Sequence, residues 1–477
     1  MTENDRRQQS GDGESPDSER GLTRRGFLIT AATAAAGLAV GACGQTQPPA
    51  PAKGSEPAKP SADKPAGGAE SKPAAPNVST GGGELHLLQW QSFVPEMDAL
   101  FEKQLQEWGA ENKVKVRLER INANDLQART AAAIQAKAGP DSIQMQYNWP
   151  WLYTDSLVDV SKEAEEVGKQ LGGYYGDQEA YCKVKDVWRA IPYAYVGNAF
   201  AYRTDFFKSA GVDKAPTTWD EFMAAGKKLK TFGKPIGQAL GHSFGDPPTF
   251  WYPVLWSFGG KEVEKNGKTV AIESAETLKA VEWAVELYNT VLAPGALSWD
   301  DSSNNRSYLA EQISCTLNGA RVYFSARKDF AKIADATDHF LMPSGPAGQH
   351  TFVLSLNHAI MSYSKNQQAA KDLIRWFTQP ERYSKWLESG KAYDIGALKQ
   401  YENEAVFTSD RKLLPFRDSV KNGKWPGWPG PSGQAAAEVQ AKYIVVDLFA
   451  KACSGEFKPA DSIKWAAGQL KGIYGKA

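Results

Sequence analysis

The sequence predicts an α/β protein of two doubly wound lobes with a ligand cleft between them. Two observations support this prediction. Residues 85–147 alternate between apolar runs typical of strands and amphipathic runs typical of helices, which is the pattern of a doubly wound sheet. The segment 191–203 is β-branched and aromatic, and Gly197-Asn198 interrupts it near its middle. We therefore expect this segment to run from one lobe into the other.

The first lobe is expected to begin with three strands and two helices in alternation. The strands cover residues 85–90, 114–118 and 142–147, and the second of them alternates apolar with basic side chains at the strand period of two. The helices cover residues 97–108 and 124–138. Ligands of doubly wound sheets bind beyond the carboxyl ends of the strands. The residues that follow the first and third strands are therefore expected at one edge of the cleft.

Four stretches organise the chain after the crossing segment. A helix is expected from Thr218, where a hydroxyl cap precedes acidic residues in the first turn. Residues 276–290 place apolar side chains on one face, as a packed helix does. Residues 247–256 form an aromatic segment in a loop-like context, and residues 298–305 form a polar loop with one tryptophan.

The last third of the chain is expected to continue the same alternation. Residues 313–317 and 352–361 are strand-like, and residues 366–378 are expected to form a helix. A rigid loop rich in Trp, Pro and Gly covers residues 425–431. Two C-terminal helices are expected after it.

The N-terminal region predicts export and a lipid anchor. Arg24-Arg25 precede a short apolar run that ends near Cys43, and this order resembles a twin-arginine signal with a lipoprotein cleavage site. We expect residues 1–43 to be the signal and Cys43 to be lipidated. Residues 44–83 are rich in Pro, Ala, Lys and Gly, so they are expected to be a disordered tether. The folded part is thus expected at the outer face of the cell membrane.

Composition argues against several functional classes. The chain has 55 basic and 55 acidic residues, so no nucleic-acid partner is expected. Its 5 histidines are not at metal-ligand spacing, and the motifs of serine hydrolases, phosphate loops and zinc proteases are missing from the sequence. We expect no metal, no cofactor and no enzymatic activity. Cys182, Cys315 and Cys453 are expected to be free buried thiols, because a protein that folds before export does so in a reducing compartment.

Several stretches, in this order, resemble the extracellular solute-binding proteins of ATP-driven importers, in the group that includes maltose-binding protein. The matching stretches are 87–90, Asp141 with Val160, 191–193 continued by 202–205, 218–222, Gly259-Gly260, Asn318-Gly319 and 365–380. The stretch 299–306 resembles a branch of the family that is assigned to carbohydrate uptake. Ala320-Arg321 and Asn148 depart from maltose-binding protein, which argues against maltodextrin as the ligand.

The resemblance implies a periplasmic-binding-protein-like fold, in which two lobes joined by hinge strands close over a sugar. By implication, the first lobe is residues 84–195 plus 353–400, and the second is residues 196–352 plus 401–477. The expected partners are a small-molecule ligand, the membrane permease of an importer and the membrane itself through the lipid anchor. The protein is expected to act as a monomer.

Sugars present apolar C–H faces and hydroxyl groups, so aromatic rings together with amide or carboxylate side chains are the residues expected to bind them. Tryptophans beside Pro, Gly, Asn or Gln are aromatic candidates, and so are the two tyrosines of the crossing segment, which are expected to share one face. The candidates are Trp90, Trp149, Trp251, Trp299, Trp425, Trp428, Tyr193 and Tyr195, with Gln91, Asn148, Asp300, Asn318 and Arg321 as polar partners. Core packing, helix capping and surface ion pairs are the structural alternatives for these residues.

Two functional hypotheses follow. The favoured one is a lipid-anchored receptor that captures a small solute and delivers it to a membrane importer. An oligosaccharide or other neutral sugar is the first candidate ligand, with a peptide or an anionic sugar held by Arg321 as alternatives. The other is an adhesive or scaffolding lipoprotein that reuses the fold. For a glycosidase, the candidate carboxylate pairs are Asp300 with Asp301 and Asp246 with Glu262.

Overall fold

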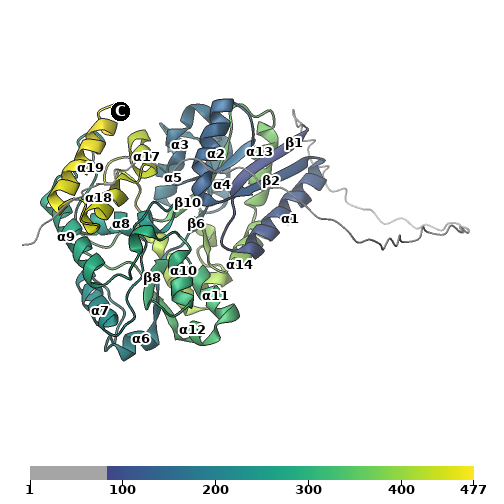
Figure 1. Cartoon of the computed structure of the whole chain (residues 1–477). Coiled ribbons are helices and arrows are strands. Elements are labelled where there is room, and N and C mark those ends of the chain that lie inside the picture. Colours follow the sequence, from purple (N-terminus) through teal and green to yellow (C-terminus); the bar gives the residue numbers. More distant parts are fainter. Residues whose placement is uncertain (1–82, 477) are drawn as a thin grey trace, which may run out of the picture. The chain divides into compact units, whose positions relative to one another are not determined.

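The computed structural model describes residues 83–476, which contain two main β-sheets (Figure 1). The larger sheet has six strands in the order β11-β6-β10-β3-β1-β2. Strand β1 is parallel to β2 and β3, whereas β10 and β11 run antiparallel to β6. The bounds of these strands are β1 Glu84–Trp90, β2 Lys115–Ile121, β3 Ser142–Gln146, β6 Ile191–Val196, β10 Leu354–Ile360 and β11 Asp394–Gly396.

The smaller sheet has three antiparallel strands in the order β8-β7-β9. Their bounds are β7 Ala199–Arg203, β8 Cys315–Asn318 and β9 Thr337–Phe340. A two-stranded hairpin, β4 Lys183–Val184 and β5 Val187–Trp188, stands apart from both sheets. Ile236 extends the smaller sheet through a parallel bridge to Cys315.

The crossing segment joins the two sheets, as the sequence predicts. Strand β6 of the larger sheet ends at Val196 and β7 of the smaller sheet begins at Ala199, so only Gly197 and Asn198 lie between them. A Cβ atom on Gly197 would lie 2.8 Å from Cγ1 of Ile395, which leaves no room for a side chain at the crossing.

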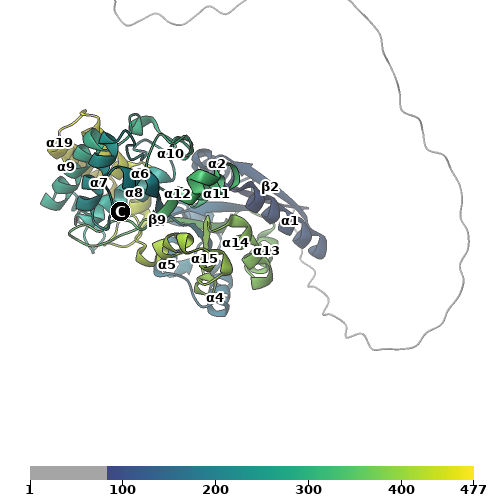
Figure 2. The same ribbon diagram turned by 90° about the horizontal axis from the view of Figure 1, so that it is seen from below.

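Helices surround the sheets and join distant parts of the sequence. In Figure 1, α18 and α19 lie beside α9, and in Figure 2, α13 and α14 lie beside α1. Their bounds are α1 Pro95–Asn112, α2 Ala123–Ala136, α3 Trp149–Leu152, α4 Ser161–Gln170, α5 Gly176–Cys182, α6 Thr204–Ser209, α7 Trp219–Thr231, α8 Asp246–Ser257, α9 Ala275–Thr290, α10 Ser303–Leu309, α11 Arg321–Asp329, α12 Ala331–Ala336, α13 Gln367–Phe377, α14 Pro380–Gly390, α15 Ala405–Thr408, α16 Leu414–Asp418, α17 Gln434–Ala441, α18 Ile444–Cys453 and α19 Pro459–Tyr474. The α/β prediction is therefore confirmed.

Two sequence expectations need correction. The aromatic segment 247–256 is a helix, α8, because Pro247 and Pro248 occupy its first turn, where a backbone N–H has no intrahelical partner to lose. The C-terminal region holds three helices rather than two. Tyr443 adopts a left-handed conformation with φ of 57°, which separates α17 from α18.

The core is formed mainly by aliphatic and aromatic side chains of both sheets and their helices. Cys182, Cys315 and Cys453 are buried and unpaired, as the sequence predicts. Burial raises the pKa of Cys182 and of Cys315 well above the usual thiol value, so both stay protonated and unreactive at neutral pH. Among residues 83–476, no helix is long and apolar enough to cross a membrane.

Helix α7 provides a test of local stability outside the cleft. The hydroxyl of Thr218 accepts a hydrogen bond from the N–H of Glu221 at 3.2 Å, and the Glu221 carboxylate accepts one from the N–H of Thr218 at 3.3 Å. Thr218→Ala is expected to lower the free energy of unfolding by about 1 kcal/mol, because it removes one half of this capping box. Urea denaturation measures the change, and Thr231→Ala at the other end of the helix is the control. Equal effects of both substitutions would contradict the capping role.

Candidate ligand-binding cleft

A small cavity lies where the two sheets meet. Its walls include aromatic rings, amides, two carboxylates and one guanidinium, and about 30 Å³ of space remains inside it. The lining residues are Trp90, Phe93, Val196, Asn198, Phe244, Gly245, Asp246, Thr249, Asp301, Asn305, Asn318, Gly319, Arg321, Leu354 and Tyr393. We call this space the cleft. Since it draws residues from both sheets, any change in their relative position alters its volume.

The aromatic wall of the cleft is built at the carboxyl end of β1. Trp90 ends that strand, and its backbone N–H donates to Oε1 of Gln144 at 3.0 Å. Its ring meets Phe93 and Phe244 edge to face, with centroid distances of 6.2 Å and 6.0 Å. These contacts hold the Trp90 ring in one orientation against the cavity.

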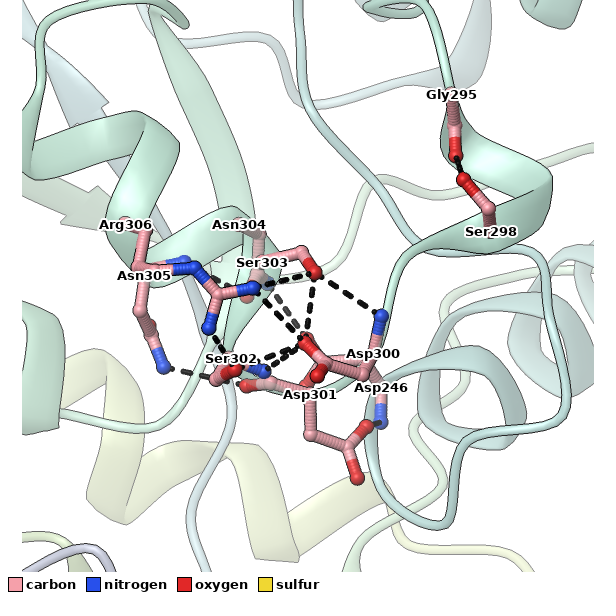
Figure 3. Close-up of polar contacts among 10 residues, drawn as sticks. All are labelled: Asp246, Gly295, Ser298, Asp300, Asp301, Ser302, Ser303, Asn304, Asn305 and Arg306. Atoms are coloured by element: carbon pink, nitrogen blue, oxygen red, sulfur yellow. Dashed lines mark hydrogen bonds and ion pairs between the residues drawn. The ribbon is translucent and has the colours of Figure 1, made fainter. Parts of the chain in front are cut away.

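Asp301 also lines the cleft, and it links its own loop to the start of α8 (Figure 3). Its carboxylate accepts hydrogen bonds from the backbone N–H groups of Gly245 at 3.0 Å and Asp246 at 2.8 Å. Burial raises the pKa of Asp301, although hydrogen bonds from Ser243 and from these two N–H groups oppose that change. The carboxylate is thus fixed at a helix N-terminus, next to the cavity.

Asp246 is the second carboxylate of the cleft. Its Oδ2 accepts a hydrogen bond from Nδ2 of Asn304 at 2.6 Å. Burial, followed by the nearby Asp301 carboxylate, raises the pKa of Asp246 well above its usual value. A ligand that donates hydrogen bonds or carries positive charge would relieve this crowding of two acids.

Two amides in the cleft keep unpaired hydrogen-bonding atoms. Oδ1 of Asn318 accepts from the N–H of Gly319 at 2.7 Å, while its Nδ2 has no partner in the described part of the chain. Nδ2 of Asn305 donates to the carbonyl oxygen of Asp301 at 3.2 Å, while its Oδ1 is likewise buried without a partner. A buried unpaired polar atom costs about 1–3 kcal/mol. A donor and an acceptor are therefore available to a ligand.

Arg321 is the cation of the cleft. It is the first residue of α11, directly after Asn318-Gly319-Ala320, and it is partly exposed. Within residues 83–476 its guanidinium forms no ion pair, so the surface salt bridge considered as an alternative is not seen. A planar guanidinium without a carboxylate partner can bind an anionic group or stack on a ring.

Of the other polar candidates, none lines the cleft. Gln91 is exposed, and its backbone N–H donates to the carbonyl oxygen of Ile121. Asn148 is fully buried and donates from Nδ2 to Oγ of Ser432 at 3.2 Å, which ties the end of β3 to the C-terminal region. Asp300 is exposed and accepts hydrogen bonds from Ser302 and Ser303 ahead of α10 (Figure 3). Burial would raise the pKa of Asp300, but these hydrogen bonds outweigh it and hold the pKa at about 2.

The remaining tryptophan candidates pack elsewhere. Trp149 is buried near Phe244, at a centroid distance of 6.3 Å, and Trp251 is fully buried against Phe449 at 5.1 Å. Trp299 is partly buried and covers Gly237 and Gly295. Trp425 donates from Nε1 to the carbonyl oxygen of Gly430 at 2.9 Å, and Trp428 packs on Trp256 and His350. None of these five rings is among the residues that line the cleft.

The two tyrosines of β6 do not share a face, which corrects the sequence expectation. Tyr193 stacks on His358 at 4.2 Å and contacts Trp386 of α14, whereas Tyr195 donates a hydrogen bond to Asp177 of α5. The register between β6 and β10 shifts at Leu356/Asn357, so the strict alternation of the strand is lost there. Neither ring lines the cleft.

Sequence reasoning missed Phe244, Asp246 and Asn305 as cleft residues. Each belongs to a loop or helix start whose position depends on packing between distant segments. For a further cleft residue, Asp301, one signal was available in the sequence. Asp301 lies next to the candidate Asp300, and neighbouring residues of a loop point in different directions. The glycosidase pairings also differ from expectation, since Asp246 lies near Asp301 while Glu262 accepts a hydrogen bond from Tyr474 at 3.3 Å.

Comparison with known proteins identifies the family. The model of the family described as bacterial extracellular solute-binding protein matches residues 101–415. The chain belongs to this family. A probable ABC transporter-binding protein from Deinococcus radiodurans is 23% identical over 342 residues, which cover 69% of this chain and 78% of that protein. A probable amino-acid ABC transporter periplasmic-binding protein from Sinorhizobium fredii is 25% identical over 272 residues, 55% of this chain and 62% of that protein.

Solved structures share the fold of this solute-binding protein. The crystal structure of a sugar transporter from Arthrobacter chlorophenolicus with bound laminaribiose superposes with a TM-score of 0.72 and 17% identity. The match covers 82% of this chain and 99% of that one. The periplasmic-binding-protein-like fold is thereby confirmed.

Within residues 83–476, no group of three or more His, Cys, Asp or Glu side chains is placed to hold a metal ion.

Proposed function

We propose that this solute-binding protein captures a neutral sugar for an ATP-driven importer. One observation carries the proposal: the cleft is lined both by aromatic rings such as Trp90 and by carboxylates and amides, among which Asn305 and Asn318 keep an unpaired acceptor and donor. Aromatic faces bury the C–H surface of a sugar and polar side chains pair its hydroxyls. The structurally similar Arthrobacter protein with bound laminaribiose supports the same ligand class.

Capture would proceed by closure about the crossing strands. The proposed lobes are residues 84–195 plus 353–400 and residues 196–352 plus 401–477. Because Trp90 belongs to the first proposed lobe and Asp301 to the second, a sugar that contacts both would stabilise the closed arrangement over an open one. The permease subunits of the importer are proposed to bind this closed form. A single copy of this protein is proposed to deliver each ligand.

Anchoring remains part of the proposal. The twin-arginine signal at residues 1–43, the lipidated Cys43 and the tether at residues 44–83 lie outside the described residues, apart from Gly83. Their sequence pattern supports an exported lipoprotein held at the outer face of the membrane. Mass spectrometry of the protein from membranes would detect a lipidated N-terminal Cys43, and a soluble form with an intact signal would contradict it.

A ligand screen tests the proposed function. Residues 81–477 are expected to gain about 2.7 kcal/mol of stability from a sugar present at a hundred times its dissociation constant. Thermal unfolding in the presence of mono-, di- and oligosaccharides measures the gain, with amino acids and peptides as comparison ligands. A folded protein that responds to none of the sugars would contradict the proposal.

An amino acid or peptide is the second candidate ligand. The crowded pair Asp246 and Asp301 suits an ammonium group, and Arg321 without an ion pair suits a carboxylate. The relative from Sinorhizobium fredii is named for amino-acid transport. Stabilisation by amino acids or peptides alone in the same screen would favour this candidate over a sugar. The adhesive or scaffolding alternative predicts no response to any small molecule.

A further inference from the structure

A second cavity lies inside the part of the protein built on the larger sheet. It is bounded by β1, β6 and β11 and by α1 and α14, which pack side by side (Figure 2). About 10 Å³ is open inside it, which is room for one group of the size of a water molecule. Its walls hold two carboxylates, those of Asp98 and Asp394, and we call it the acid cavity.

Asp394 of β11 is the group in the acid cavity that lacks a partner. Its side chain is 1% exposed, and neither carboxylate oxygen has a hydrogen-bond partner among residues 83–476. Among the buried carboxylates of the described residues, only Asp394 leaves both oxygens unpaired. An ionised carboxylate in this state is costly, so a partner inside the cavity would lower the free energy of the folded protein.

Asp98 of α1 adds a second acid without a balancing cation. It is buried, and its Oδ2 accepts a hydrogen bond from the N–H of Ser92 at 3.1 Å. Among the described residues, no Lys or Arg lines the acid cavity. Arg120 of β2 is engaged elsewhere, since Nη2 donates to the backbone carbonyl of Asp98 at 2.7 Å and to Glu102 at 2.9 Å. The cavity therefore combines two acids with no basic side chain.

Aromatic rings form much of the remaining wall. The rings belong to Trp90, Phe101, Tyr193 and Trp386, and the centroids of the last two lie 5.7 Å apart. The faces of such rings attract cations through their quadrupole. A neutral water molecule would fit by size, but it would not oppose the charge of an ionised carboxylate. Carboxylates together with aromatic rings favour a small cation as the occupant.

The ligands available select the charge of that cation. Calcium takes six to eight oxygen ligands and magnesium requires an octahedron of them. The described residues hold no group of three or more His, Cys, Asp or Glu side chains placed for a metal ion, and the acid cavity has two carboxylates. Its neutral oxygens come from Gln89 and Ser92, which also line it. A monovalent cation fits this small set of ligands better than a divalent one.

We propose that the acid cavity binds one monovalent cation of about the size of a water molecule, of the class of potassium or ammonium. The cation takes the place of the proton on Asp394. One proton is released to solvent for each cation bound, so the charge inside the protein does not change. This site is separate from the proposed sugar site, with which it shares the Trp90 ring alone among the described residues.

Exchange with a proton makes the affinity depend on pH. Burial, followed by the charge of Asp98, raises the pKa of Asp394 well above its usual value, so the proton competes with the cation at neutral pH. The other titratable groups around Asp394 are Asp98 of α1, Tyr193 of β6, Tyr383 of α14 and Tyr393 of β11. Burial raises the pKa of each tyrosine well above 10, so all three stay neutral below that pH. Cation affinity should therefore rise with pH.

Melting temperatures of the full chain in different chloride salts test this proposal. Potassium and ammonium are compared at equal ionic strength with tetraethylammonium, which is too large for the acid cavity. We expect the two small cations to raise the melting temperature saturably, by about 1–2 °C at ten times the dissociation constant. From pH 6 to pH 8 their affinity should rise by at most about tenfold per pH unit, the limit for one released proton.

Two variants locate the response. Asp394→Asn should lose it, because an amide carries no charge and releases no proton. In tetraethylammonium alone this variant should be more stable than the parent, and potassium should narrow the difference. Glu262→Gln is the matched control. Glu262 is a fully buried carboxyl group whose pKa burial raises to about 7, and it lies outside the acid cavity. This variant should keep the response to potassium.

Crystals soaked in thallium(I), which replaces potassium and scatters anomalously, give a readout that needs no variant. An anomalous peak in the acid cavity is the expected result. Its absence, or melting temperatures that do not distinguish the small cations from tetraethylammonium, would overturn the proposal and leave a water molecule as the occupant. An equal potassium response in the parent and in Asp394→Asn would also overturn it, because the cation would then act elsewhere. No sugar is present in these experiments, so their result is independent of the proposed function.

Discussion

Asp301→Asn is expected to weaken sugar binding by ten- to a hundredfold, while Asp300→Asn leaves it unchanged. Asp301 presents its carboxylate to the cleft from the N-terminus of α8, and hydrogen bonds to a charged acceptor contribute about 1.5–3 kcal/mol. Asp300 is one residue away, but it is exposed and hydrogen-bonded to Ser302 and Ser303. The two substitutions therefore make the same change in charge at neighbouring positions, of which only Asp301 lines the cleft.

Calorimetry on both variants measures the difference, after thermal unfolding has shown how much each substitution changes stability. Asp301 also caps α8, so a modest loss of stability is expected from Asp301→Asn. The binding loss should persist at a temperature where both variants are fully folded. Similar affinities of the two variants would mean that Asp301 is only a helix cap.

Asp394→Asn is expected to stabilise the protein at neutral pH by on the order of 1–3 kcal/mol. Asp394 lies in β11, is 1% exposed, and neither of its carboxylate oxygens has a hydrogen-bond partner among residues 83–476. Burial, followed by the charge of Asp98, raises the pKa of Asp394 well above its usual value. A carboxyl group whose pKa is raised in the folded state lowers the stability of the protein at every pH above its unfolded-state pKa of about 4. An amide of similar shape avoids that loss.

The effect should depend on pH in a defined direction. Because the pKa of Asp394 is higher in the folded state, the folded protein binds a proton that the unfolded chain releases, and stability falls as pH rises above about 4. The advantage of Asp394→Asn over the parent should thus be small at pH 4 and grow toward pH 7. Asp141→Asn is the control, since Asp141 accepts hydrogen bonds from the N–H of His86 at 2.8 Å and from Oγ of Ser364 at 2.6 Å. We expect that variant to be destabilised, and a loss of stability in Asp394→Asn would contradict the reasoning.

Local patterns were sufficient to predict most of the fold. The alternation of residues 115–118 predicted strand β2, and the cap at Thr218 predicted the start of α7. Gly197-Asn198 predicted where β6 ends. These signals are local, because strand period, helix capping and glycine flexibility act over a few residues. Helix α8 was missed for the same reason: its side chains are buried on all sides, so no amphipathic period marks it.

The site was harder to predict because it depends on long-range packing. Three of the predicted candidates line the cleft. Trp90 and Asn318 end strands β1 and β8, and Arg321 begins α11 shortly after β8, in keeping with the rule that ligands bind near strand ends. Trp251 has the same residue type but points into the core against Phe449. Composition and neighbouring residues do not distinguish a tryptophan at the cleft from one in the core. Only the packing of α8 against other helices shows that Trp251 belongs to the core.

The central position of β10 has a consequence for the synthesis of the chain. Strand β10 lies between β3 and β6, and all seven of its residues are buried, yet it begins only at Leu354. A nascent chain that has not reached this residue exposes the hydrogen-bonding edges of β3 and β6. The larger sheet therefore cannot be completed on the ribosome until most of the polypeptide has emerged, and such distant pairing makes folding slow. During that interval the open edges are available to molecular chaperones, which would protect them from pairing with other chains.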